Sequence, residues 1–598
     1  MSLASCESWL DEDPQYTINT KTQFSTVENA RQALMGCYGY MSADNAYGQA
    51  WQEVTFGYCG FGWSQTNGSS TDLLVSMDGG IDETINTMAW RGMYKVIGET
   101  NAFIANIADS PLESADKLPM EAAARFLRAL AYYNLAVTYG DVPLKTTPSA
   151  HDGVAVPRSP KNEVFELVRT DWEFAYENLP EKDDDGFATK WAAKAYLGKL
   201  YHTLGCQGDN TAWEKAKACF DEVMPKYRLA DKFSDLFVDY VQGSPESIFQ
   251  LNFALAGSTT RNRGSWLVAP NGSCNGQAWD RIRASKALYD YFLATYPGDP
   301  RIESTFLTYW KSYAGVGKGE KPKEEPIASA RDTVYAYPYF TYTIEGEEKP
   351  AGWKKPKLYV GRIPYEKLAD PASPKAEELY AMIADTATAT PAEKGYLKGL
   401  LSLLENATKK PSTNTKSWPY FKKPWDPEQS GNNSHKNLIL YRYADMLLMA
   451  ADVYNELGQT DKAITFANEV LKRARQSGNA SQPADWRSGL SKEQVREKIY
   501  FERIFEGAGE PEMYQKMRLR GTEFLKKAFE VNNGHGIIQE SVANNPKGNG
   551  NWGERIFNDG NLNDENFLKK NLLLPVPKDE IDTNSALDYS DNNYGYTN

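Results

Sequence analysis

The sequence predicts an all-α fold in which tetratricopeptide-like helix pairs form the scaffold and an irregular, loop-rich region forms the ligand face. Two observations predict the scaffold: apolar residues recur at spacings of three and four, and small residues stand where two antiparallel helices would touch. A third observation predicts the loop-rich region, because tryptophan, glycine and asparagine accumulate in segments that break this periodicity. The helix pairs are scattered along the chain, which indicates a helical globule and not a simple solenoid.

The first helix pair begins with AARFLRALAYYNLAVTYGDVPL, residues 123–144. Gly140 ends this helix because glycine permits a positive φ. The partner helix lies in SPKNEVFELVRTDWEFAYENLP, residues 159–180, with Ser159 as the expected N-cap and Pro160 at the first helical position. The expected buried positions of the two helices are Ala129, Tyr132, Leu135, Ala136, Tyr139, Phe165, Val168, Trp172 and Ala175.

Two further pairs follow, in WAAKAYLGKLYHTLGCQGDNTAWEKAKACFDEVM, residues 191–224, and in RYADMLLMAADVYNELGQTDKAITFANEVLKRAR, residues 442–475. In the last pair Gly458 suits a left-handed C-terminal cap and Thr460 is the expected N-cap of the second helix. The expected buried positions of these pairs are Gly198, Tyr201, Leu204, Gly205, Ala216, Phe220, Val223, Tyr443, Leu447, Ala450, Ala451, Tyr454, Leu457, Ala463, Ala467, Val470 and Ala474.

Composition narrows the function classes. The chain has 598 residues, with 41% hydrophobic and 24% charged residues, as is ordinary for a folded protein. Its net charge of −13 argues against a nucleic-acid partner, because phosphates attract basic surfaces. No run approaches the roughly 18 apolar residues of a membrane-spanning helix.

Catalytic motifs are not found in the sequence, so we expect no enzyme. The histidines form no HExxH pattern, no G-x-S-x-G elbow or phosphate loop occurs, and His202 is expected to be a partly exposed turn residue. The four histidines are His151, His202, His435 and His535. Carboxylates are abundant, and counting them does not exclude a glycosidase pair. Structural ion pairs and caps between helices are the expected role of Arg125, Arg128, Arg442 and Asp445.

Two irregular segments supply the candidate ligand face, residues 49–80 and residues 265–285. An exposed indole can stack on the apolar face of a pyranose ring, while asparagine, aspartate and arginine satisfy its hydroxyl groups. For any single tryptophan the alternative is that it anchors its loop to the core. The candidate ligand-binding residues are Trp51, Tyr58, Trp63, Asp72, Trp266, Asn271, Trp279, Arg281 and Trp310.

The N-terminal residues and the cysteines indicate whether the protein is exported and anchored by a lipid. Leu3-Ala4-Ser5-Cys6 fits the bacterial lipobox, in which small residues precede a cysteine that is acylated, so Cys6 is the expected lipid-attachment site. No charged leader and no apolar run precede Cys6. The other cysteines show no CxxC spacing and are expected to be mostly small buried residues, with one disulfide left open. These are Cys37, Cys59, Cys206, Cys219 and Cys274.

Six sequence blocks follow one another in the order CESWLDEDP, WRGMYKVIGETNAFIANI, ARFLRALAYYNLAVTYGDVPL, RYADMLLMAADVYNELG, VREKIYFERIFEGAGEPEMYQKMRLRG and LLLPVPKDEIDTNSAL…NNYGY. Together they resemble the SusD/RagB family of surface glycan-binding lipoproteins from Bacteroidetes. The chain departs from the family's pattern at Asp452, where glutamate is usual, and at Met513 and Gln515, at or near the usual arginine and aspartate.

The resemblance implies a non-catalytic protein that binds glycans at the cell surface and delivers them to a SusC-like, TonB-dependent transporter of the outer membrane. It places the ligand on a shallow surface outside the tetratricopeptide-like scaffold and implies no cofactor; a structural calcium ion is left open. The acidic run after Cys6 resembles the signal that sends Bacteroidetes lipoproteins to the cell surface. A glycoside hydrolase on a helical scaffold and a tetratricopeptide-type peptide-binding or peptide-uptake protein are the alternatives.

The expected organisation has four parts. Residues 1–21 form the lipid-attachment site and tether, and residues 22–260 form an N-terminal half with tetratricopeptide-like pairs. Residues 261–430 form a loop-rich middle segment that contributes to the ligand face. Residues 431–598 form a C-terminal helical half of the RagB/SusD type.

Overall fold

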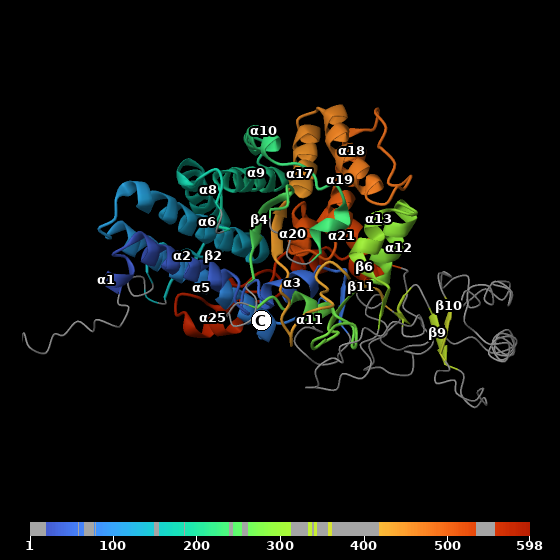
Figure 1. Cartoon of the computed structure of the whole chain (residues 1–598), viewed down its shortest axis with the longest axis horizontal. Coiled ribbons are helices and arrows are strands. Elements are labelled where there is room, and N and C mark those ends of the chain that lie inside the picture. Colours follow the sequence, from blue (N-terminus) through green and yellow to red (C-terminus); the bar gives the residue numbers. More distant parts are fainter. Residues whose placement is uncertain are drawn as a thin grey trace, which may run out of the picture.

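A computed structural model gives the structure of the chain, and Figure 1 shows its helices and strands. It describes residues 20–57, 59–64, 77, 79–148, 153, 155–183, 186–238, 243–253, 261–311, 333–337, 340–343, 357–360, 418–533 and 557–597. Over this part of the chain the molecule is mostly helical, as the sequence predicts, and its strands are short and occur in pairs. The predicted division of the chain into four parts stays a prediction.

The N-terminal half is built from long antiparallel helices. Helix α5 (Thr84–Ala108) packs on α6 (Ser114–Tyr139), and α6 packs on α8 (Lys161–Asn178). Gly140 follows α6 with φ 75°, which confirms the expected helix end. The N-cap of α8 is Pro160 and not Ser159, because the chain is still extended at proline, with ψ 136°.

The next pair, α9 (Lys190–Cys206) and α10 (Ala212–Val223), is close-packed through small residues. A Cβ atom added at Gly198 would stand 2.4 Å from the ring of Phe220, and one at Gly205 would stand 2.6 Å from the ring of Trp213. Two aromatic rings of α10 pack directly on α9 at these positions, so a larger residue there would clash with them. This explains why the sequence has small residues at this helix contact.

The last predicted pair is α17 (Tyr443–Glu456) and α18 (Thr460–Gln476), against which α19 (Lys492–Gly507) packs. Gly458 has φ 78°, as the left-handed cap requires. Thr460 is the first helical residue and Gln459 is the N-cap, so the predicted boundary is off by one residue.

Shorter helices complete the fold. They are α1 (Thr20–Gln23), α2 (Val27–Met41), α3 (Ala50–Gly57), α11 (Gly264–Val268), α12 (Lys286–Thr295), α13 (Pro300–Thr305), α20 (Met513–Arg518), α21 (Gly521–Glu530), α23 (Asp559–Leu562), α24 (Glu565–Lys570) and α25 (Lys578–Thr583), with the 3-10 turns η2 (Met224–Lys226), η3 (Phe233–Leu236) and η7 (Tyr589–Asp591).

Every strand pair is antiparallel. The pair β4 (Ser247–Leu251) with β12 (Leu438–Arg442) joins segments far apart in sequence and lies between the N-terminal helices and α17. The others are β1 (Gly62–Ser64) with β5 (Ile282–Ala284), β2 (Val142–Pro143) with β3 (Arg158–Ser159), β6 (Phe306–Leu307) with β11 (Tyr420–Phe421), β7 (Tyr309–Lys311) with β8 (Thr333–Tyr335), and β9 (Phe340–Thr343) with β10 (Lys357–Val360).

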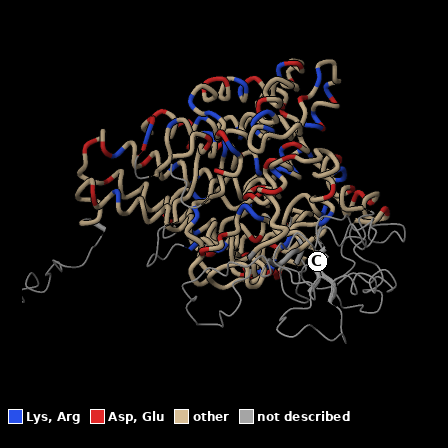
Figure 2. The backbone as a smooth tube through the Cα atoms, turned by 45° about the vertical axis from the view of Figure 1, so that its right-hand side comes forward, with Lys and Arg blue, Asp and Glu red and all other residues tan. Residues whose placement is uncertain are grey.

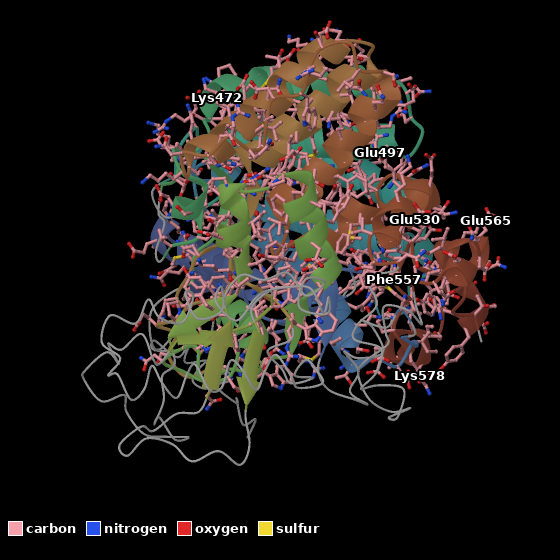
Figure 3. The ribbon with its side chains drawn as sticks, turned by 90° about the vertical axis from the view of Figure 1, so that its right-hand side faces the viewer. Lys472, Glu497, Glu530, Phe557, Glu565 and Lys578 are labelled. Atoms are coloured by element: carbon pink, nitrogen blue, oxygen red, sulfur yellow. The ribbon has the colours of Figure 1, made fainter. Side chains whose placement is uncertain are left out.

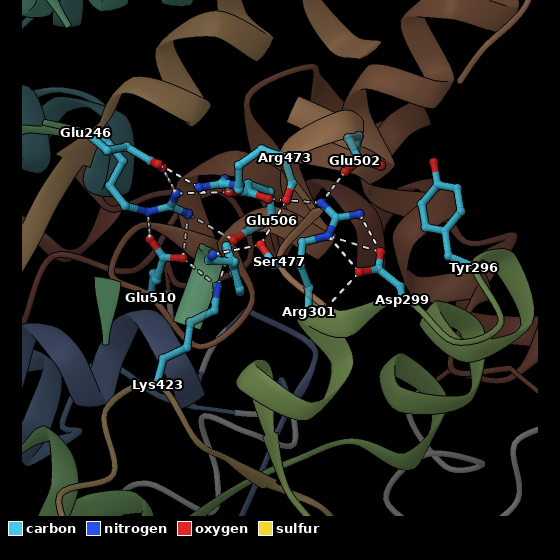
Figure 4. Close-up of polar contacts among 12 residues, drawn as sticks. Glu246, Tyr296, Asp299, Arg301, Lys423, Arg473, Ser477, Glu502, Glu506 and Glu510 are labelled. Carbon is cyan, nitrogen blue, oxygen red and sulfur yellow. Dashed lines mark hydrogen bonds and ion pairs between the residues drawn. The ribbon is translucent and has the colours of Figure 1, made fainter. Parts of the chain in front are cut away.

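A buried charge network joins α13, α18, α19, β12 and the residue before β4 (Figure 4). Glu506 on α19 accepts hydrogen bonds from Arg442, from Arg473 on α18 and from Arg301 on α13. Arg442 also donates to Glu246 beside β4, at 2.6 Å.

The ion pairs expected for Arg128, Arg442 and Asp445 are confirmed, with Arg128 to Asp171 at 2.8 Å and Asp445 to Arg503 at 3.0 Å. Arg125 also lies 3.4 Å from Asp171 on α8, and it forms a second pair within α6, with Glu121 at 2.6 Å. Lys and Arg positions are interspersed with Asp and Glu positions along the backbone in Figure 2. None of the helices that the structure describes combines the length and the apolar character needed to cross a membrane.

Candidate functional site

The fold brings the two predicted loop regions together. Gly62 of β1 pairs with Ala284 of β5, so the region after α3 lies against the region after α11. The segment before β5 folds back on α11, because the amides of Trp279 and Arg281 donate to the carbonyl oxygens of Trp266 and Leu267, each at 2.9 Å. In the view of Figure 1 this region lies at the bottom of the molecule, away from α17 and α18.

The centre of the candidate site is the indole pair, Trp266 and Trp279. Their ring centroids are 4.3 Å apart and their planes differ by 22°, so the rings are stacked. Trp279 is 37% exposed and Trp266 is partly buried. An exposed large ring held in one orientation by a second ring loses little side-chain entropy when it contacts a ligand.

Two arginines flank the indole pair. Cζ of Arg281 lies 4.3 Å from the ring centroid of Trp279, and Cζ of Arg263 lies 5.6 Å from that of Trp266. These guanidinium groups cover part of the ring surface and stabilise the stack through cation–π contacts. What remains open to a ligand is the exposed part of Trp279.

Helix α3 and the loop before it fix both guanidinium groups. Arg281 Nε donates to Glu53 Oε1 at 2.7 Å, and Arg263 pairs with Asp44 at 3.0 Å. Arg263 also donates to Gln49 Oε1 at 2.6 Å. Each guanidinium charge next to the indole pair is therefore balanced by a carboxylate.

The loop between the two indoles is anchored to residues 427–431. The amide of Asn275 donates to the carbonyl oxygen of Pro427 at 2.7 Å, and that of Gln277 to Gly431 at 2.5 Å. A Cβ atom at Gly276 would stand 2.2 Å from the Gly431 carbonyl oxygen, so the approach needs glycine. The side chains of Asn271 and Gln277, on the same loop as Trp279, are exposed and offer amide donors and acceptors.

The structure places the other predicted site residues differently. Trp51 is fully buried and Trp310 is 4% exposed, so neither indole offers a face to a ligand. Trp51 lies in the core beside Tyr47, and Trp310 packs on Tyr420. Arg281 is 7% exposed, and its guanidinium group lies over the ring of Trp279 instead of facing a ligand.

The side chains of four predicted residues lie outside the described part of the structure. Cys6, Tyr58 and Asp72 lie outside the described residues. Trp63 lies in β1, but its side chain is outside the description. The sequence did not single out Arg263, Glu53 or Gln49. Gln49 directly precedes α3 and Glu53 lies on it, and their spacing of four residues was an available signal.

One cluster has the residue types of a metal site: His202, Cys206 and Asp452. His202 Nε2 lies 2.9 Å from Asp452 Oδ2, and Cys206 Sγ lies 3.8 Å from the same nitrogen. Both oxygens of Asp452 also accept from Arg520, at 2.7 and 2.6 Å. A guanidinium group on the only carboxylate would repel a cation there, so the cluster does not fit a metal ion.

The same cluster corrects the expectation for His202. Its side chain is fully buried and not at an exposed turn, and burial lowers its pKa although Asp452 opposes that shift. Burial raises the pKa of Cys206 to about 12, which leaves its thiol unreactive. The five cysteines among the described residues are free, and all but Cys206 are buried, as expected.

Comparisons with known proteins agree with this architecture. Residues 8–202 match a family model described as "Starch-binding associating with outer membrane", and residues 245–596 match the model of the SusD family. A SusD-like protein of Formosa agariphila is 23% identical over 535 residues, which cover 85% of this chain and 86% of the relative.

Solved structures show the same fold. A SusD homolog from Bacteroides thetaiotaomicron superposes with a TM-score of 0.69 at 18% identity, covering 96% of this chain and 98% of the homolog. A laminarin binding SusD-like protein superposes with a TM-score of 0.60 at 19% identity, covering 96% of this chain and all (100%) of that protein. Because the SusD family model matches more than half of the sequence, this protein belongs to the SusD family.

Proposed function

We propose that this protein binds oligo- or polysaccharides at the cell surface, without catalysis, and delivers them to a SusC-like, TonB-dependent transporter of the outer membrane. The observation that carries the proposal is the exposed, stacked indole pair on the loop-rich face of a SusD-family fold. The laminarin binding relative supports a glycan as the ligand class.

The geometry favours weak binding. One exposed ring and a few amide groups on an open surface give about −4 to −8 kcal/mol, which corresponds to a dissociation constant from about millimolar to micromolar. Such an affinity suits delivery, because a ligand that is held loosely can be passed on. The proposed anchor is a lipid on Cys6, which would tether the protein to the outer face of the outer membrane.

The peptide-binding alternative makes a different structural prediction. A peptide would use the helix pairs, where an open cleft of about 670 Å³ lies between α8 and α9. That cleft has an apolar floor, formed by Phe165, Leu200 and Leu204, and mixed charges at its rim. Loss of binding on substitution of Leu204 and not of Trp279 would support the peptide alternative.

A glycan array probed with the purified full-length protein tests the proposed ligand class, and we expect retention of at least one polysaccharide. Incubation of the bound glycan with the protein should release no new reducing ends, whereas a glycoside hydrolase would release them. Protease treatment of intact host cells tests the location. If the protein is untouched, and detergent extraction recovers it without a β-barrel partner, surface delivery is refuted.

A further inference from the structure

Lys286 is a lysine whose amine the fold leaves without a hydrogen-bond acceptor. It is the first residue of α12, directly after β5, and Ser285 caps the helix by accepting from the amide of Leu288 at 3.1 Å. The Lys286 side chain is partly exposed. Among the described residues, none accepts a hydrogen bond from its Nζ, and none forms an ion pair with it within 4 Å.

Two aromatic rings enclose the amine instead. Nζ lies 5.3 Å from the ring centroid of Tyr337 and 5.0 Å from that of Trp418. Both rings are largely buried, with 7% and 8% exposure. Tyr337 is fixed because its hydroxyl contacts both oxygens of Asp290, at 2.6 and 2.7 Å. Asp290 therefore holds the Tyr337 ring in place beside the amine.

The electrostatic consequence is a weakly basic amine. Burial lowers the pKa of Lys286 to about 8, and the nearby Asp290 carboxylate opposes that shift. Lys423 also has a pKa lowered to about 8 by burial, but its Nζ donates to Glu510 at 2.5 Å and to the Glu506 carbonyl oxygen at 2.7 Å. Lys423 is fully engaged in hydrogen bonds and buried, whereas Lys286 is only partly buried and donates no hydrogen bond to a described residue.

We propose that Lys286 is a carbonyl-reactive site that forms an imine with aldehydes. The lone pair of the uncharged Nζ attacks the aldehyde carbon, and a C–N bond forms to give a carbinolamine. The C–O bond then breaks, and the oxygen leaves as water with the two protons that the amine loses. A desolvated lysine between apolar groups is the environment in which such chemistry occurs in proteins.

The proposal does not depend on glycan binding. At pH 7 a lysine with a pKa near 8 is about 10% uncharged, against roughly 0.04% for an ordinary lysine. The free-amine population of Lys286 is therefore on the order of 200-fold larger. Its lower basicity and partial burial offset part of this advantage, so we expect at least about tenfold faster modification.

The test uses the full chain, glycolaldehyde as the probe and sodium cyanoborohydride as the reductant, with each lysine quantified by peptide mass spectrometry. We expect Lys286 to be modified at least about tenfold faster than the exposed Lys182 at pH 7, with a rate that levels off above about pH 8. Lys423, with a similar pKa but no access, is the internal control and should stay unmodified.

Two variants complete the design. Lys286→Arg should remove the fast site and leave all other sites unchanged. Trp418→Leu should rehydrate the amine and bring the rate at position 286 towards that of Lys182. The proposal is overturned if Lys286 in the unaltered protein reacts no faster than Lys182, or if its rate still rises steeply between pH 9 and pH 10.

Discussion

Replacing Glu506 by glutamine tests the role of the buried charge network. One oxygen of this carboxylate accepts from Arg442 at 3.0 Å and from Arg473, and the other accepts from Arg301 at 2.9 Å. Burial alone would raise the pKa of Glu506, but Arg473, Arg442 and Arg301 together hold it well below the usual range. The side chain is 1% exposed, so glutamine would leave three guanidinium groups short of one buried negative charge.

Removing one partner from such a buried network costs about 3–5 kcal/mol of unfolding free energy. That is a large part of the 5–15 kcal/mol by which folded domains are usually stable. Glu497→Gln is the matched control on the same helix, because Glu497 is exposed at the periphery of Figure 3 and pairs with Lys527 at 2.6 Å on the surface. An exposed pair contributes about 0–1 kcal/mol.

The assay is urea unfolding followed by circular dichroism for the unaltered protein and both variants. We expect the Glu506→Gln midpoint to fall clearly and the Glu497→Gln midpoint to stay within error. If Glu506→Gln lowers the free energy of unfolding by less than about 1 kcal/mol, the hydrogen bonds of Glu506 with the three arginines do not stabilise the fold as we infer.

Three further predictions follow from single positions. Gly92→Ala should destabilise the fold by about 1–3 kcal/mol, because its Cβ would stand 2.0 Å from the Asn45 carbonyl oxygen. Gly36→Ala, on open helix surface, should stabilise it by roughly 0.5–1 kcal/mol in the same urea unfolding assay. Burial raises the pKa of Glu83 to about 7. The unfolded chain loses this proton at a lower pH than the folded protein does, so the free energy of unfolding falls as the pH rises towards 7. Glu83→Gln should therefore be more stable than the unaltered protein at pH 8 and equally stable at pH 4. Burial opposes ionisation of Asp445, but Arg503 and Lys516 hold its pKa well below the usual range. The ionised Asp445 therefore adds to the free energy of unfolding above about pH 4, and this contribution is lost as the pH falls. In an acid titration, Asp445→Asn should lose less unfolding free energy than the unaltered protein.

The helices could be predicted from the sequence because their signals are local. Spacings of three and four identify α6, α9 and α17, and Gly140 and Gly458 identify two of their ends. The N-caps predicted at Ser159 and Thr460 were each misplaced by one residue, because these helices begin at Pro160 and Gln459 without the side-chain cap hydrogen bond that the prediction assumed.

The candidate site was predictable as a region but not residue by residue. Composition alone singled out Trp266 and Trp279, yet the same criterion selected Trp51 and Trp310, which the core encloses. Whether an indole faces solvent depends on segments that arrive from elsewhere in the chain. His202 shows the same limit, because its partner Asp452 lies 250 residues away.

The proposed glycan site is tested most directly by calorimetry of the retained polysaccharide with Trp279→Ala and with the control Tyr40→Ala. Both side chains are 37% exposed, but Tyr40 lies on α2 and outside the indole pair. We expect Trp279→Ala to weaken binding about 30-fold, the equivalent of about 2 kcal/mol for a central contact residue, with an unchanged melting temperature. Tyr40→Ala should bind as the unaltered protein does. Equal affinity of Trp279→Ala and the unaltered protein would contradict the assignment of the ligand to the indole pair.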